Sequence, residues 1–269
     1  MTPAARVQAA IEILARWQAG EGPAERLLAS WGRANRYAGS GDRRAVADRV
    51  YGALRQWRSA GWASGAETPG ARDVVLGYAA LAGEELGALF DGSRHGPAAL
   101  TGAERSRLRD LAEAPRGVRL DLPDWLLPET DGVADEVWAR LRHRAPVDLR
   151  VNRLKTDPAQ AAVALTAAGI ETSPVEADPD ALRVTAGAHR VQGSDPFRAG
   201  LVELQDASSQ AVVRLAGAAP DQTVLDFCAG GGGKTLALAA HMANRGALYA
   251  HDISAARLQQ AEARAARAG

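Results

Sequence analysis

The sequence is poor in several residue types, and each shortage excludes a class of structure. Cys228 is the only cysteine among 269 residues, so no disulfide can form within the chain. The five histidines show no metal-ligand spacing, and with one cysteine a zinc site is not expected. No apolar run approaches the roughly 18 residues of a membrane span, and the N-terminus lacks a signal-peptide core. We therefore expect a cytoplasmic protein without a metal.

Charge is balanced over the whole chain but not along it. Lys and Arg together number 32, as do Asp and Glu, and this net charge of zero neither supports nor excludes nucleic acid. Within residues 1–60, however, arginines clearly outnumber acidic residues. Such an excess fits an anionic partner, and it equally fits the solvated face of basic helices. Lysine is nearly absent, so Lys234, directly after a glycine run, is less easily explained as surface filler.

The first part of the chain has helical periodicity. Breaks at 20–23 and 39–41 separate apolar stripes with helical spacing, which contain Val7, Ile11 and Leu14 in one helix and Val46, Val50, Leu54 and Trp57 in another. Further helices are predicted near 71–82, 101–113 and 131–143. No convincing strand occurs before about residue 147. We therefore expect an all-α domain over residues 1–118.

A small α/β module is expected over residues 119–200. LDLPDWLLPE at 120–129 contains two prolines and is expected to cross between domains. VDLRVN at 147–152 alternates like a strand. The segment 157–169 predicts a helix with Asp157 as N-cap, Pro158 at its first position and Gly169 past its end. Two more strands are predicted, at 170–176 and 181–186.

From residue 201 to residue 269, strands and helices alternate. LVELQ at 201–205 predicts a short strand, and Asp206 can cap the helix that follows. A buried strand at 223–228, a helix at 234–243, a second strand at 246–252 and a second helix at 254–268 complete the pattern. This alternation is typical of right-handed βαβ units with a parallel sheet.

The stretch VLDFCAGGGGKT at 224–235 has the composition of a ligand-binding loop. A phosphate-binding P-loop requires G-x-x-x-x-G-K-[ST]. Gly233, Lys234 and Thr235 fit its end, but its first glycine would stand where the chain has Cys228. A dinucleotide-binding G-x-G-x-x-G loop is also disfavoured, because Thr235 occupies the sixth position.

The same stretch meets the needs of a site for S-adenosyl-L-methionine (SAM). Asp226 ends a strand, glycines let the backbone approach a ligand, and Lys234 begins a helix whose N-terminus favours a carboxylate. Asp252 closes the next strand, where an acid can accept hydrogen bonds from ribose hydroxyls. Structural interpretations stay open: either acid could cap a helix, with Ser254 a rival cap, Lys234 could be solvated, and the glycines could form a flexible turn.

Several motifs resemble the Sun/RsmB family of RNA (cytosine-C5) methyltransferases: QDASSQ at 205–210, the loop at 224–235 and AHD at 250–252. The family's loop usually reads Cys-Ala-Ala-Pro-Gly-Gly-Lys-Thr; here Gly230 and Gly231 replace the Ala-Pro pair, which makes the loop more flexible. Residues 6–14 and 42–55 are similar to the NusB-like helical domain of the ribosomal RNA members. The segments 148–157 and 196–210 are similar to the small RNA-contacting module and its junction.

The resemblance implies three parts. These are a NusB-like all-α RNA-binding domain over 1–118, a small α/β RNA-contacting module over 119–200, and the start of a Rossmann-like class I methyltransferase domain over 201–269. It implies methyl transfer from SAM to C5 of a cytosine in RNA, with small-subunit ribosomal RNA as the substrate, and we expect a monomer. The implied cofactor-binding residues are Cys228, Ala229, Gly230, Gly231, Gly232, Gly233, Lys234 and Asp252.

The reaction needs an activated cysteine. Cytosine C5 becomes nucleophilic after a thiolate adds at C6, and a base later removes the C5 proton. The resemblance places Cys228 in the cofactor loop and the reactive cysteines in Pro-Cys and Thr-Cys motifs further along. We therefore assign no catalytic residue and expect an N-terminal piece of a methyltransferase, inactive alone. The alternative is a non-catalytic RNA-binding or ribosome-assembly protein with a partial SAM-binding fold.

RNA contacts are expected at two basic clusters, with a solvated surface as the alternative for each. The strand cluster consists of Arg150, Asn152, Arg153 and Lys155. Arg150 and Asn152 would share one face of their strand. The helical cluster consists of Arg33, Arg36, Arg43 and Arg44 around a loop.

Overall fold

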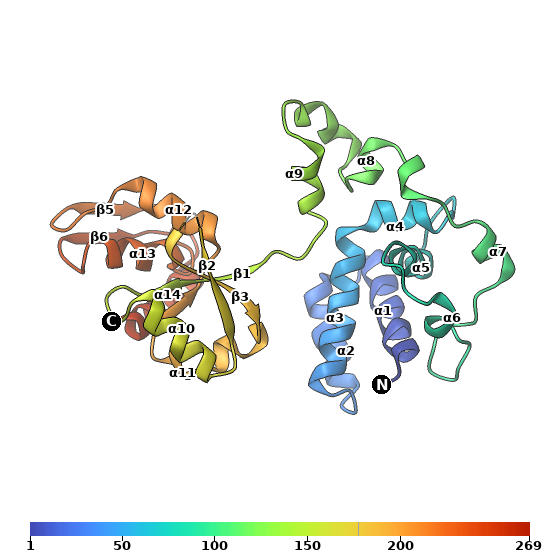
Figure 1. The fold of residues 1–269 in the computed structure, drawn as a ribbon, viewed down its shortest axis with the longest axis horizontal. Helices are drawn as coiled ribbons and strands as arrows, with labels where there is room; N and C mark the ends of the chain where they lie inside the picture. Colours follow the sequence, from blue (N-terminus) through green and yellow to red (C-terminus); the bar gives the residue numbers. More distant parts are fainter. Residues whose placement is uncertain (177) are drawn as a thin grey trace. The chain divides into compact units, whose positions relative to one another are not determined.

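The structure is a computed structural model that describes residues 1–176 and 178–269. It divides into two compact units, Met1–Ala145 (unit 1) and Pro146–Gly269 (unit 2). The strands among the described residues all lie in unit 2, as Figure 1 shows. No helix in the described part of the chain is long and apolar enough to cross a membrane. The finer division into three domains remains a prediction.

Unit 1 is helical. In chain order its helices are α1 (Pro3–Gln18), α2 (Ala24–Ala34), α3 (Ser40–Arg55), α4 (Trp57–Ala63), α5 (Ala71–Leu81), α6 (Leu86–Leu89), α7 (Gly102–Ser106), η1 (Leu111–Glu113), α8 (Arg116–Arg119), η2 (Asp124–Thr130) and α9 (Asp135–Arg140). Its apolar core lies among the helices from α1 to α6 and includes Val7 and Leu14 of α1 and Val46 and Val50 of α3, all fully buried. The apolar stripes of the sequence therefore mark the inward faces of these helices.

Parts of unit 1 differ from the sequence-based predictions. Gln56 interrupts the helical run, so Trp57 begins α4 instead of extending α3. The helices predicted at 101–113 and 131–143 are shorter than expected: the first is α7 and η1 with a non-helical stretch between them, and the second is α9. The segment 120–129 was expected to cross between domains, yet it packs on α4. Asp121 accepts hydrogen bonds from the Ser59 backbone N–H at 2.8 Å and from its hydroxyl at 2.7 Å.

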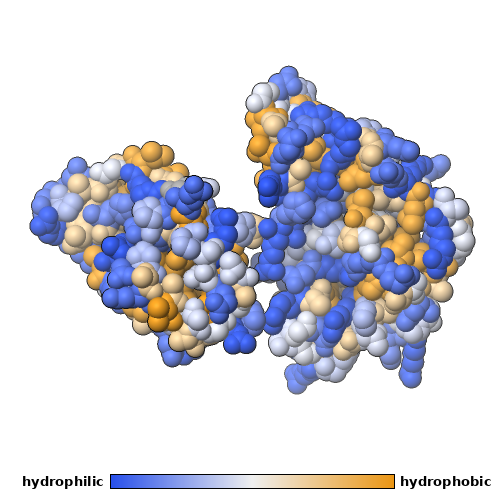
Figure 2. Space-filling model, viewed as in Figure 1, coloured by the Kyte–Doolittle hydropathy of each residue, from blue (hydrophilic) through white to orange (hydrophobic). Residues whose placement is uncertain are grey.

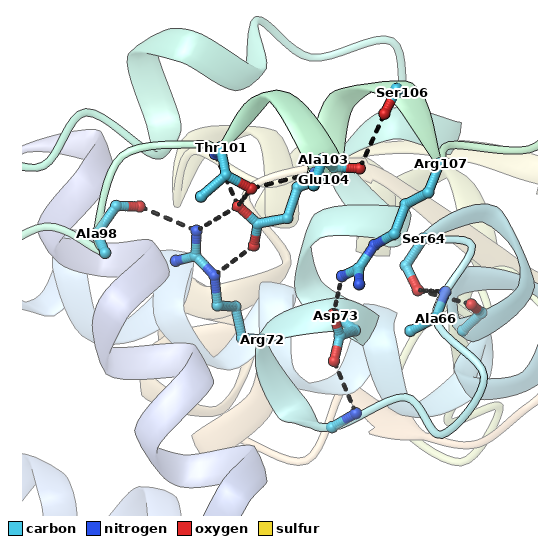
Figure 3. Close-up of polar contacts among 12 residues, drawn as sticks. Ser64, Ala66, Arg72, Asp73, Ala98, Thr101, Ala103, Glu104, Ser106 and Arg107 are labelled. Carbon is cyan, nitrogen blue, oxygen red and sulfur yellow. Dashed lines mark hydrogen bonds and ion pairs between the residues drawn. The ribbon is translucent and has the colours of Figure 1, made fainter.

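Ion pairs fasten α7 and its flanks to α5 (Figure 3). Arg72 Nε donates to Glu104 Oε1 at 2.9 Å, and Arg107 pairs with Asp73. Glu104 also closes a capping box with Thr101, whose backbone N–H donates to Glu104 Oε2 at 2.8 Å. The hydrogen bond from Arg72, helped by those from Thr101, lowers the pKa of Glu104 to about 2. This carboxylate therefore stays ionised into strongly acidic solution.

A four-stranded antiparallel sheet forms the first part of unit 2. Its elements are β1 (Val147–Val151), α10 (Pro158–Ala167), β2 (Glu171–Val175), β3 (Asp178–Ala186), η3 (Ala188–Gly193), α11 (Asp195–Arg198) and β4 (Val202–Leu204). The strand order is β2-β3-β1-β4, and each neighbouring pair is antiparallel. The predicted capping of α10 is confirmed, since Asp157 Oδ1 accepts from Gln160 N at 2.9 Å. Leu149 and Val151 of β1 pack with Leu165 of α10 in the core.

The remaining elements of unit 2 are α12 (Ala207–Ala216), β5 (Thr223–Asp226), α13 (Gly233–His241), β6 (Ala247–Ala250) and α14 (Ala255–Ala268). β5 and β6 pair in parallel, as the alternating pattern predicts for them. The segment 201–205 was expected to belong with these strands, but its strand β4 pairs antiparallel with β1 and so joins the other sheet.

Residues 223–228 were predicted to form a buried strand, but the strand β5 is covered on only one of its two faces. Val224 of β5 and Leu248 of β6 pack against a small cluster with Val213 of α12 and Leu238 of α13. Side chains alternate along a strand, so Leu225 and Tyr249 point to the opposite face, where they are 59% and 61% exposed. Helices therefore cover one face of this pair of strands within the described residues.

Candidate functional site

The glycine loop, residues 228–233, joins the end of β5 to the start of α13. Gly230 and Gly232 adopt φ of +53° and +79°, a left-handed conformation that glycine takes without steric cost. A Cβ added to Gly232 would lie 2.7 Å from the Ala261 Cβ, so α14 passes directly against the loop. Glycine is thus required at 232 both by backbone conformation and by space.

Backbone N–H groups at the end of this loop lack acceptors. Gly232 N donates to Ala229 O at 2.9 Å, which closes the turn. In the described part of the chain, the N–H groups of Gly233, Lys234 and Thr235 have no hydrogen-bond partner. Free N–H groups are normal in the first turn of a helix, and together with the helix dipole they favour an anion.

Asp226 and Asp252 fasten the loop at its two sides. Asp226, the last residue of β5, accepts from Thr235 Oγ1 at 2.7 Å. Asp252, just after β6, accepts from Ser254 N at 2.8 Å and Gly230 N at 2.9 Å. The hydrogen bonds from Ser254 and Gly230 lower the pKa of Asp252, so it is ionised at neutral pH. Ser254 holds the N-cap position of α14, so neither acid is the N-cap of a helix.

A cavity of about 480 Å³ lies beside the loop. Its charged walls consist of Asp148, Asp206, Asp226, Lys234 and Arg264. Asp148 is paired with Arg183 at 2.8 Å, whereas the Lys234 side chain is exposed. Burial acts to raise the pKa of Asp206, but hydrogen bonds from Ser209 and the charge of Lys234 outweigh it and lower this pKa. The cavity thus presents both signs of charge at neutral pH.

The eight predicted cofactor residues occupy three kinds of position. Cys228, Ala229, Gly233 and Lys234 line the cavity, with Cys228 exposed. Gly230, Gly231 and Gly232 form the turn itself. Asp252 braces the loop through Gly230 and does not line the cavity. Among the described residues, His, Cys, Asp and Glu form no group suited to a metal ion.

The RNA contacts predicted at the strand cluster are wrong for Arg150 and Asn152, which are buried and bond within unit 2. Lys155 is exposed, so its RNA contact stays a prediction. Arg150 is 6% exposed, and its Nη1 donates to Gly233 O at 2.8 Å and Gln205 Oε1 at 2.9 Å. Asn152, 5% exposed, donates from Nδ2 to Ala268 O at 2.8 Å. Lys155 Nζ donates to Arg267 O at 2.7 Å. The shared strand face was predicted correctly, but α14 and the glycine loop lie over it instead of solvent.

The arginines of the helical cluster, unlike Arg150 of the strand cluster, are exposed to solvent. Arg33, Arg36 and Arg44 are exposed, and they form no ion pair with any described residue. Arg43 is also exposed, although its Nε donates to Ala38 O at 3.0 Å. These side chains are available to an external partner. Figure 2 displays the mixture of polar and apolar residues at the surface of each unit.

Two family models match unit 2 and the end of unit 1. Residues 122–191 match the RsmF/B-like methyltransferase ferredoxin-like domain, and residues 213–269 match the 16S rRNA methyltransferase RsmB/F. Two regions of the chain are thus similar to RsmB/F methyltransferases. The second match contains the glycine loop and Asp252, whereas Asp148 and Asp206 of the cavity lie outside it.

Curated proteins are similar to parts of the chain. A probable ribosomal RNA small subunit methyltransferase B of Synechocystis is 32% identical over 156 residues, which are 56% of this chain and 35% of the relative. Its Bacillus subtilis counterpart is 35% identical over 136 residues, 49% of this chain and 30% of the relative. The chain therefore spans about a third of the length of these relatives.

Solved structures share the fold. The protein PH0851 superposes with a TM-score of 0.67 at 19% identity, covering 100% of this chain and 68% of its own. A methyltransferase homologue from Pyrococcus horikoshii has a TM-score of 0.52 at 26% identity, covering 57% of this chain and 52% of its own. The mixed helix-and-sheet architecture is thus one that methyltransferase relatives adopt.

Proposed function

We propose that this protein is an RsmB/F-type methyltransferase, which transfers a methyl group from SAM to C5 of a cytosine in small-subunit ribosomal RNA. The observation that carries the proposal is the glycine loop, with its free N–H groups beside a cavity that has charges of both signs. In this proposal, residues 201–269 contribute to a Rossmann-like class I methyltransferase domain. Residues 1–118 form a NusB-like RNA-binding domain, and residues 119–200 an RNA-contacting module.

The cavity suits the charges of the cofactor, which supplies the methyl group. SAM has a carboxylate, an ammonium and a sulfonium group. Lys234 and the free N–H groups at the start of α13 would hold the carboxylate. Asp206 and Asp226, on the walls of the same cavity, would face the cationic groups. An ionised carboxylate has about four acceptor positions, so Asp252 keeps capacity for ribose hydroxyls beyond its two backbone bonds.

Within this proposal, Cys228 belongs to the cofactor loop and not to the reacting groups. It lies on the cavity wall between β5 and α13, next to Ala229, whose N–H donates to His251 O at 2.9 Å. The residues of this chain therefore bind and orient the cofactor. RNA would be bound by the exposed helical cluster of unit 1, because Arg150 and Asn152 of the strand cluster are buried and committed to internal contacts.

Calorimetric titration of SAM tests the cofactor site. Lys234→Ala and Asp252→Asn should each weaken binding by about tenfold, the effect of losing one charge-assisted interaction. Asp252→Asn keeps an acceptor for Gly230 N, but its amide NH2 then faces Ser254 N, so the variant removes the charge and one of the two backbone hydrogen bonds. Asp195→Ala, an acid in unit 2 whose side chain is 97% exposed, is the control and should bind as the unaltered chain does. Wild-type affinity in both site variants would remove the cofactor assignment.

A further inference from the structure

Two arginines from different elements hold carbonyl groups of the glycine loop. Arg150 reaches it from β1, where Nη1 donates to Gly233 O at 2.8 Å. Arg264 reaches it from α14, where Nη1 donates to Gly231 O at 2.6 Å. Hydrogen bonds from an ionised donor are roughly twice as strong as neutral ones. Alternate carbonyls of the loop are therefore held from two sides.

A buried carboxylate anchors this arrangement. Glu203 of β4 is 7% exposed and pairs with Arg267 at 2.6 Å and with Arg264 at 3.4 Å, so it fixes α14 to the sheet. Asn152 and Lys155 add hydrogen bonds to the last carbonyls of the same helix. Arg264 thus donates to the loop from a helix that is itself tied to the antiparallel sheet.

Burying the charged side chain of Arg150 costs solvation free energy. It lies in the interior, and its Nε has no partner in the described part of the chain. Burial lowers its pKa to about 10, against the opposing effect of Glu203. Removing an ion from water costs several kcal/mol, and a buried ion contributes to stability only where hydrogen bonds offset that cost. The hydrogen bonds of Arg150 that do so connect β1 to Gln205 and to the glycine loop.

Peptide geometry connects these contacts with the free N–H groups. A trans peptide is planar, so a carbonyl and the N–H of the next residue point in opposite directions. Holding Gly233 O therefore fixes the direction of the Lys234 N–H, and holding Gly231 O fixes that of the Gly232 N–H, which closes the turn onto Ala229. Four consecutive glycines would otherwise sample many conformations. This chain also has Gly230 and Gly231 where the loop it resembles has a stiff Ala-Pro pair.

We infer that Arg150 and Arg264 are positioning residues, which hold the glycine loop through its carbonyls so that the N–H groups at the start of α13 keep one orientation. The consequence for cofactor affinity rests on the proposed function, whereas the consequence for the loop itself does not. The two effects can therefore be measured separately in the same variants.

The experiment combines hydrogen exchange, thermal unfolding and SAM calorimetry on the 269-residue chain. The variants are Arg150→Met, which keeps the bulk of a buried side chain, and Arg264→Met, which leaves the buried Glu203 paired with Arg267 and should therefore still fold. The matched control is Arg198→Met, because Arg198 donates to the Gly193 carbonyl away from the loop. Both test variants should exchange about tenfold faster in peptides covering 228–236 and bind SAM about tenfold more weakly, with the control unchanged.

Each alternative outcome has a definite meaning. Unchanged exchange at 228–236 in the folded variants would overturn the inference. Faster exchange spread over all of unit 2, in step with a lower melting temperature, would also overturn it, since that is what a merely structural role predicts. Faster exchange confined to the loop, with no SAM binding by any protein including the unaltered chain, would support the loop-holding role and reject the proposed cofactor.

Discussion

Two basic clusters that look alike in the sequence differ in how deeply their residues are buried. In the strand cluster, Arg150 and Asn152 are buried and donate to carbonyls of the glycine loop and of α14. In the helical cluster, Arg33 and Arg36 are exposed and have no ion pair among the described residues. The difference shows that basic charge on a strand face indicates an RNA contact only when no other element packs on that face.

The largest expected effect comes from removing an internal donor of the strand cluster. Asn152→Ala should lower the free energy of unfolding of unit 2 by about 2–3 kcal/mol, because the buried Gly200 carbonyl and the half-buried Ala268 carbonyl lose their donor. Chemical denaturation measures the loss. Arg153→Ala is the control from the same cluster: its side chain is 47% exposed and 3.5 Å from Asp180, so a change below about 0.5 kcal/mol is expected. Equal losses would contradict the distinction between buried and exposed members.

An effect of intermediate size is expected on the pH dependence of stability, because Arg72 donates to a carboxylate that titrates and Arg150 donates to groups that do not. The folded-state pKa of Glu104, about 2, lies below its ordinary value of 4.5. A depressed carboxyl pKa contributes stability that is complete above the unfolded-state pKa, so this contribution is lost as pH falls from 4.5 through 2. It amounts to about 2 kcal/mol after allowance for partial exposure. Arg150 donates to a carbonyl and an amide, which do not titrate, so its contacts persist in acid.

Acid titration of stability, followed by circular dichroism, measures that effect. Glu104→Gln should remove this part of the stability at neutral pH and flatten the loss between pH 4.5 and 2. Glu21→Gln offers a control, because Glu21 is 47% exposed and pairs with the similarly exposed Arg16. Parallel pH curves for the unaltered chain and Glu104→Gln would show that the Arg72 pair contributes nothing.

The smallest effect on stability is expected in the helical cluster. The triple variant Arg33→Ala, Arg36→Ala and Arg44→Ala should unfold within about 0.5 kcal/mol of the unaltered chain. Its affinity for single-stranded ribosomal RNA should nevertheless depend less on salt, with the slope of log K against log salt reduced by about 2. Fluorescence anisotropy at several salt concentrations measures this slope. An unchanged slope would mean that these arginines do not contact phosphates.

Local signals made much of the fold predictable. Asp157 and Asp206 were identified as helix caps from their places before apolar periodic segments, and both accept the expected backbone N–H. The glycine loop was located between a strand and a helix, where the structure has it. What failed was non-local: nothing in the segment 201–205 indicates that β4 pairs antiparallel with β1, because strand pairing depends on residues far away in the chain.

The candidate site also has features that local sequence determines and features that depend on distant residues. The sequence alone determined the glycine run, Lys234 at the start of a helix and an acid at each strand end, because backbone conformation and capping depend on neighbouring residues. Only the tertiary structure decided that Asp252 bonds Gly230 and that Arg150 and Arg264 hold the loop carbonyls. Hydrogen-bonding capacity belongs to a side chain, but its partner is whichever group the packing of β1, β4 and α14 brings within about 3 Å.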